Sequence, residues 1–194
     1  MEIKLIALIL SIVFLIASYL PYLRNIFRRK TQPHAYTWLI WTITVGTATL
    51  GIWYGNGGLA VLTLLITTIF NLIIFILSFK YGTKNITKSD TIFLVIAFIA
   101  IFIWWQLKQP LIALIIVTLI DFFGFIPTIR KTWQEPWSET TISWIFFVIS
   151  TIFLIISLKQ YNLMTLIYLL IMGTLDTITA SLCILRRRKI EKPY

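Results

Sequence analysis

The sequence contains very few of the residues on which enzymes and disulfide-bonded domains depend. Among its 194 residues there are one cysteine, one histidine and seven Asp or Glu. Cys183 alone cannot form an intrachain disulfide, and His34 alone cannot build a site with several imidazole ligands. There is also no nucleophile-and-base set, glycine-rich phosphate loop or Cys/His cluster. We therefore expect neither an enzyme nor a bound cofactor or metal ion.

Charge is also scarce: 12% of the residues are charged, whereas 59% are apolar. Such a composition is typical of a protein embedded in a lipid bilayer. Seven apolar segments are each close to the ~20 residues that a membrane-spanning helix needs, and helices satisfy their own backbone in lipid. We predict an all-α membrane protein with seven spans. They run roughly over Ile3–Leu20, Tyr36–Tyr54, Gly58–Phe79, Thr91–Leu107, Pro110–Ile129, Thr141–Leu158 and Leu163–Leu185.

The basic residues alternate between the two sides of these spans. Fourteen of the 17 Lys and Arg follow the first, third, fifth and seventh spans, and only Lys4, Lys108 and Lys159 lie on the other side. Cytoplasmic loops carry such an excess. We predict a multi-pass protein of the plasma (inner) membrane, with its N-terminus outside and its C-terminus in the cytoplasm. The basic residues that give the chain its net charge of +10 then lie beside lipid headgroups, and no nucleic-acid partner is expected.

The two halves of the chain match at a constant offset of 106 residues. The matched pairs are Pro21 and Pro127, Arg24 and Arg130, Trp38 and Trp144, and the similar Tyr19 and Phe125. After a one-residue deletion the offset becomes 105, which aligns Asn71 with Asp176. Duplicated membrane units are typical of transporters. We predict a first repeat at 1–82, a linker helix at 83–108, a second repeat at 109–187 and a basic tail at 188–194.

The linker helix has no partner in the repeat. Three helices would leave the second copy inverted, and one extra crossing restores its orientation. The prediction is therefore two parallel triple-helix bundles joined by a linker helix, a 3+1+3 arrangement.

In these features the chain resembles the SWEET, semiSWEET and PQ-loop repeat superfamily of membrane transporters, as a divergent bacterial-type member. The resemblance lies in Pro21-x-x-Arg24 through Trp38, in Pro127-x-x-Arg130 through Trp144 and in the polar residues of the third and seventh spans. It implies a sugar transporter in which the asparagine of the third helix lines the pocket. Tyr22 and Thr128 replace the glutamine of the PQ motif, which leaves the branch and the solute open.

Four residues are candidates for binding a solute near the bilayer midplane: Asn71, Asp121, Asp176 and Trp41. A carboxylate at that depth is costly, ~2.5–3.5 kcal/mol on insertion scales, so each acid should face a cavity or a partner. The acids either hold a polar or cationic solute, serve as proton-coupling sites, or join helices by hydrogen bonds. For Asn71 there are two interpretations: its amide contacts the solute, or it forms an interhelical hydrogen bond.

Pro21 and Pro127 are candidate hinges for an inner gate, because each removes a backbone donor near a basic loop. The alternative is that they end their helices. Trp38, Trp133, Trp137 and Trp144 are expected at the inner membrane interface, as part of an aromatic belt.

The predicted function is transport of a small polar solute, with sugar first, by alternating access and facilitated diffusion. One alternative is a proton-coupled carrier of an amino acid or vitamin precursor that uses Asp176 and Asp121. The other is a membrane receptor or assembly factor of the same fold that transports nothing. The oligomeric state is open, and a homo-oligomer is one option.

Overall fold

The computed structural model describes residues 2–29, 33, 35–82, 109–134 and 136–191, with isolated positions between 91 and 106. Within these ranges the protein is all-helical and contains no strand. The α-helices are α1 (Glu2–Phe27), α2 (Ala35–Tyr54), α3 (Val61–Tyr81), α5 (Pro110–Gln134), α6 (Thr141–Ser157) and α7 (Leu163–Arg187). Two short 3-10 helices, η1 (Gly58–Ala60) and η2 (Pro136–Ser138), precede α3 and α6. The all-α fold class is thus confirmed.

The helix boundaries follow the apolar segments closely, with one systematic difference. α1 continues past Pro21 to Phe27, and α5 continues past position 127 to Gln134. The interpretation that the prolines end their helices is therefore wrong, because the backbone stays helical on both sides of them. The predicted linker at 83–108 lies largely outside the described residues and stays a prediction.

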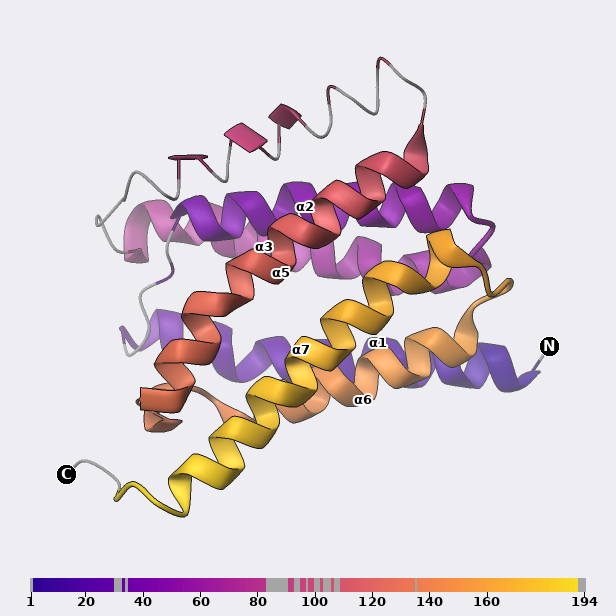
Figure 1. The fold of residues 1–194 in the computed structure, drawn as a ribbon. Coiled ribbons are helices and arrows are strands. Elements are labelled where there is room, and N and C mark those ends of the chain that lie inside the picture. Colours follow the sequence, from indigo (N-terminus) through magenta and orange to yellow (C-terminus); the bar gives the residue numbers. More distant parts are fainter. Residues whose placement is uncertain are drawn as a thin grey trace.

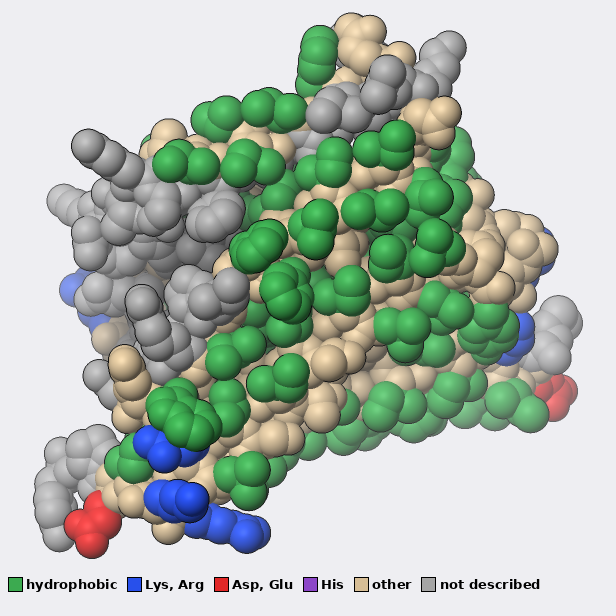
Figure 2. Space-filling view, in the orientation of Figure 1, with side chains coloured by type: hydrophobic (Ala, Val, Ile, Leu, Met, Phe, Trp, Pro, Cys, Tyr) green, Lys and Arg blue, Asp and Glu red, His purple; other side chains and the backbone are tan. Residues whose placement is uncertain are grey.

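The surface of the molecule is suited to lipid. Three helical segments, Glu2–Phe27, Gly58–Tyr81 and Leu163–Arg187, are long and apolar enough to cross a membrane. Large hydrophobic side chains are exposed along these helices, among them Ile3, Phe79 and Leu170. Figure 2 shows hydrophobic side chains over the middle of one face, with Lys and Arg gathered toward its two ends. A membrane-embedded protein is the arrangement that such a surface fits.

The helix contacts occur in matched pairs (Figure 1). α1 packs against α6 as α5 packs against α2, and α1 contacts α3 as α5 contacts α7. The contact of α2 with α3 is likewise matched by that of α6 with α7. If α1, α2 and α3 are replaced by their repeat counterparts α5, α6 and α7, the contacts within the first half become the contacts within the second half. The two halves are joined through the α1–α6 and α2–α5 contacts.

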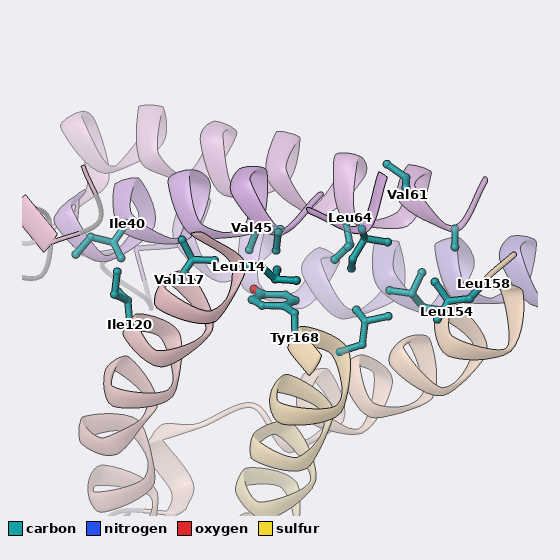
Figure 3. Packing of buried hydrophobic residues seen from close by; sticks show 14 residues of the cluster. Ile40, Val45, Val61, Leu64, Leu114, Val117, Ile120, Leu154, Leu158 and Tyr168 are labelled. Atoms are coloured by element: carbon teal, nitrogen blue, oxygen red, sulfur yellow. The ribbon is translucent and has the colours of Figure 1, made fainter. Parts of the chain in front are cut away.

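The main apolar core lies where the halves meet. Figure 3 shows the ring of Tyr168 among Val45, Leu64 and Leu114, which come from three other helices. The cluster extends to Leu158 at the end of α6. Ile40 and Ile120 belong to the same cluster (Figure 3), so apolar packing runs along the interface between the halves as far as the end marked by Leu158.

At the same end the α2–α3 turn contacts the α6–α7 turn. Lys159 N–H donates to the Gly57 carbonyl at 2.9 Å, and Asn162 Nδ2 donates to the Gly55 carbonyl at 2.7 Å. Gly58 has φ +70°, and a Cβ on it would lie 2.7 Å from the Lys159 Cβ. Glycine is needed there for both its conformation and its size. The glycine-rich turn thus allows the two repeats to touch through their backbones.

Replacing Asn162 with alanine tests this contact. Asn162 also begins α7 with a capping box, in which its side chain accepts from the Thr165 N–H at 3.1 Å. Loss of the cap and of the Gly55 bond should lower the free energy of unfolding by about 2 kcal/mol. Denaturant unfolding in detergent measures this, and Gln160→Ala, at an exposed neighbour, is the matched control. Equal destabilisation by both variants would contradict the prediction.

Candidate functional site

A cavity of about 390 Å³ lies between the two halves. All six described α-helices contribute to its lining. Its volume is in the range of small-molecule pockets. It reaches the α5–α6 turn, where the partly exposed Glu139 and Thr140 line it. We call this the open end.

The opposite end is closed by a group of buried hydroxyls. Ser11 donates to the Thr63 Oγ1 at 3.2 Å, its hydroxyl lies 3.3 Å from that of Ser150, and Ser150 donates to the Ser11 carbonyl at 2.8 Å. These bonds join α1 to α3 and to α6. Beyond them Lys4 Nζ donates to the Leu158 carbonyl at 2.7 Å. We call this the closed end.

The four solute-binding candidates come from four different helices and all line this cavity. Trp41 is on α2, Asn71 on α3, Asp121 on α5 and Asp176 on α7. The fold thus places residues that are up to 135 positions apart in the sequence on the wall of one cavity. Their role in binding stays a prediction. Of the two hinge candidates, Pro21 is not among the lining residues, and the side chain of Pro127 lies outside what the structure describes.

Asn71 is already engaged on both sides of its amide. Its Oδ1 accepts from the Tyr19 hydroxyl at 2.7 Å, and its Nδ2 donates to the Trp41 carbonyl at 3.3 Å. It is 2% exposed. These bonds join α3 to α1 and α2, so Asn71 links three helices. They use one of its two N–H donors and one of the two acceptor sites on Oδ1, which leaves one of each for a solute.

The two acids have much less hydrogen bonding. The Tyr168 hydroxyl donates to Asp121 Oδ2 at 2.8 Å, while Asp121 Oδ1 is buried without a partner among the described residues. For Asp176 no hydrogen bond is found within the described part of the chain. Both residues are buried, with exposed fractions of 2% and 9%. A carboxylate oxygen that lacks a hydrogen-bond donor from the protein can accept a hydrogen bond from a ligand.

The repeat explains why Asp176 lacks a partner. Asp176 corresponds to Asn71, and the residue that corresponds to Tyr19, the donor to Asn71, is Phe125. Phenylalanine has no hydroxyl to donate. The interhelical bond of the first half is therefore missing from the second half, and a carboxylate replaces the amide there.

Aromatic rings form a continuous wall on the open-end side of the cavity. Neighbouring ring centroids lie between 5.1 and 6.4 Å apart, and every member lines the cavity. In order, this aromatic wall consists of Tyr22, Trp38, Trp41, Phe125, Trp144, Phe147 and Tyr19. Three pairs of its members are related by the offset of 106: Trp38 and Trp144, Trp41 and Phe147, and Tyr19 and Phe125.

The lining of the cavity corrects one expectation and adds three residues. Trp38 and Trp144 line the cavity instead of a belt among lipid headgroups, and Trp38 is only 7% exposed. Phe147 was missed, although its position 106 residues after Trp41 marks it. Tyr168 and the hydroxyl of Tyr19 were also missed. A tyrosine inside an apolar span needs a partner for its hydroxyl, and Asp121 and Asn71 were among the few available.

The α5–α6 turn at the open end is held by the end of α7. Arg187 donates to the carbonyls of Glu139 and Pro136 at 2.6 and 3.1 Å, and its guanidinium lies 4.5 Å from the Trp137 ring centroid. Arg186 lies in the same way over Trp133, at 4.3 Å. The backbone beside the cavity mouth is therefore fixed by two cations that stack on tryptophans.

No group of three or more His, Cys, Asp or Glu that could hold a metal ion occurs among the described residues. Neither a family model, nor a curated protein, nor a solved structure matches the chain. The superfamily resemblance thus rests on the quoted motifs and stays a prediction.

Proposed function

We propose that this protein is an integral membrane transporter that moves a small polar solute by alternating access. The observation that carries the proposal is the cavity between the two halves. It is lined by polar groups of both halves, reaches one surface at Glu139 and Thr140, and is closed at the other by Ser11, Thr63 and Ser150. A path that is open at one end and sealed at the other by hydrogen bonds is what one state of such a carrier requires.

The proposed architecture is two parallel triple-helix bundles joined by a linker helix in 83–108. The matched helix contacts support it, since the contacts within α1–α3 recur within α5–α7 and the α1–α6 contact is matched by α2–α5. The smaller contact of α2 with α7 has no comparable counterpart between α6 and α3. The termini lie at opposite ends of the molecule, as an odd number of crossings requires (Figure 1). In this arrangement Pro21 and Pro127 loosen the helices α1 and α5 toward the open end and act as hinges.

The proposed orientation has the N-terminus outside and the open end of the cavity toward the cytoplasm. It is supported by the excess of Lys and Arg beside that end, including Arg186 and Arg187. The structure would then be the inward-facing state of the carrier.

Cysteine labelling tests the orientation. In a Cys183→Ala background, Gln160→Cys should react with an impermeant maleimide added to intact cells, because this exposed residue lies in the α6–α7 turn. Lys189→Cys, exposed after α7, should react only after the membrane is permeabilised. The reverse pattern would overturn the orientation and leave the helix packing unaffected.

For the mode of transport we propose facilitated diffusion, and the resemblance favours sugar as solute. Proton coupling is the second candidate, because Asp121 and Asp176 are buried carboxylates on the cavity. Uptake into proteoliposomes, across a panel of sugars, amino acids and nucleosides, tests the proposal against empty liposomes. We expect saturable uptake of at least one solute class. Absence of flux, with a tightly bound ligand or protein partner found instead, would favour a receptor.

A further inference from the structure

Among the described residues, the charged side chains that line the cavity all have one sign. Asp121, Asp176 and Glu139 line it, and no Lys, Arg or His is found among its described lining residues. The chain as a whole carries a net charge of +10. Two described basic groups beside the open end are held elsewhere: Arg186 and Arg187 lie on tryptophan rings and donate to backbone carbonyls. The cavity is therefore a negative region inside a basic protein.

Asp121 and Asp176 have few groups that would satisfy them. Within the described residues, the one hydrogen bond found to either acid is from Tyr168 to Asp121. The Thr44 hydroxyl lies near Asp121 but donates to the Ile40 carbonyl. A buried carboxylate without a counter-charge or hydrogen bonds is costly. A bound cation would supply both, because an ammonium group donates hydrogen bonds and carries the opposite charge.

The aromatic wall suits the same ligand. Trp41 and Phe125 line the cavity together with Asp121 and Asp176, and Trp144 continues the wall beside them. The faces of such rings attract cations by roughly 0.5–2 kcal/mol each, most strongly where water is excluded. They also cover the apolar part of an organic molecule. A metal ion has no apolar part for these rings to cover.

We propose that the cavity binds a small organic cation, a primary amine or quaternary ammonium. The charged group sits at Asp121 and Asp176, and the remainder of the molecule lies against the aromatic wall. Binding follows from the cavity alone, whereas transport of this cation rests on the proposed function. This assignment differs from the sugar that the resemblance implies.

The test compares cations with uncharged molecules of the same shape. Two such pairs are choline with 3,3-dimethylbutan-1-ol, and tyramine with tyrosol. We expect purified protein in nanodiscs to bind each cation at least about tenfold more tightly than its neutral counterpart, measured by isothermal titration. Asp121→Asn with Asp176→Asn should abolish this preference. Leu170→Ala, at a lipid-facing residue of α7, is the matched control and should retain it.

A second variant tests the site without removing a charge. Phe125→Tyr places a hydroxyl at the position that corresponds to Tyr19, so it should donate to Asp176 as Tyr19 donates to Asn71. A carboxylate satisfied in this way should bind choline several-fold more weakly. Because the acids and the fold are retained, this variant remains informative if the double substitution fails to fold.

Several results would overturn the assignment. These are neutral isosteres or glucose binding as tightly as the cations, no binding of either cation at millimolar concentration, or an unchanged preference in the folded double variant. Flux measured on the same protein separates the two proposals. Cation binding without flux would contradict the transporter and support the cation site, whereas glucose flux without cation preference would do the opposite.

Discussion

A disulfide between positions 11 and 150 should stop transport reversibly. The hydroxyls of Ser11 and Ser150 lie 3.3 Å apart on α1 and α6, and both residues are buried at the closed end. Side chains this close are within reach of disulfide geometry. In a Cys183→Ala background, the oxidised Ser11→Cys/Ser150→Cys protein cannot separate α1 from α6 there. We expect uptake into proteoliposomes to fall to the level of empty liposomes and to recover with dithiothreitol.

Two observations distinguish a locked carrier from a damaged one. Each single cysteine variant should transport with and without oxidant, and the oxidised double variant should still bind solute, because the open end is untouched. Full transport by a protein that is shown by mass spectrometry to be completely cross-linked would refute opening between α1 and α6.

Asp176→Ala should reduce uptake more than any other single substitution in the cavity. Asp176 has no hydrogen-bond partner among the described residues, so its carboxylate joins no helices by a hydrogen bond there and is available to a solute. A charged hydrogen bond contributes about 1.5–3 kcal/mol, which corresponds to a loss of roughly tenfold to a hundredfold in apparent affinity. Initial uptake rates over a range of solute concentrations measure this.

Asp121→Ala is the informative comparison. Asp121 bonds to Tyr168 and thereby joins α5 to α7, so its loss should lower thermal stability more and uptake less than that of Asp176. If both alanine variants transported normally, the midplane-site hypothesis would be wrong, and the acids would only join helices. Asp176→Asn separates the two modes of transport. In a proton-coupled carrier it should abolish solute accumulation driven by a pH gradient, whereas in a facilitator it should keep substantial uptake, because an amide, Asn71, already stands at the corresponding position of the other repeat.

The helix boundaries could be predicted because charge and glycine interrupt the apolar segments. Gly57 and Gly58 separate the second span from the third, and Asn162 begins the seventh helix. The ends of α1 and α5 were placed too early. Helices can continue beyond the hydrocarbon core once their basic side chains, such as Arg24, reach water. Apolar periodicity alone cannot locate such an end.

Which polar groups meet could be predicted only in part. The offset of 105 aligned Asn71 with Asp176, and both do line one cavity. Partners such as Tyr168 were not found, because helices that are apolar on most sides give no pattern that reveals which face is buried. The same ambiguity assigned Trp38 to the membrane interface, since tryptophan suits both a headgroup region and a cavity wall.

The replacement of a tyrosine–amide pair by Phe125 and Asp176 makes the two walls of the cavity chemically different. An assembly of two identical halves would offer a solute two equivalent poses related by rotation. Here we expect a molecule with one polar and one apolar end to have a single preferred pose, with its head at α5 and α7 and its tail toward α1 and α2. The difference between the halves thereby removes the second, rotated pose that a symmetric carrier would allow.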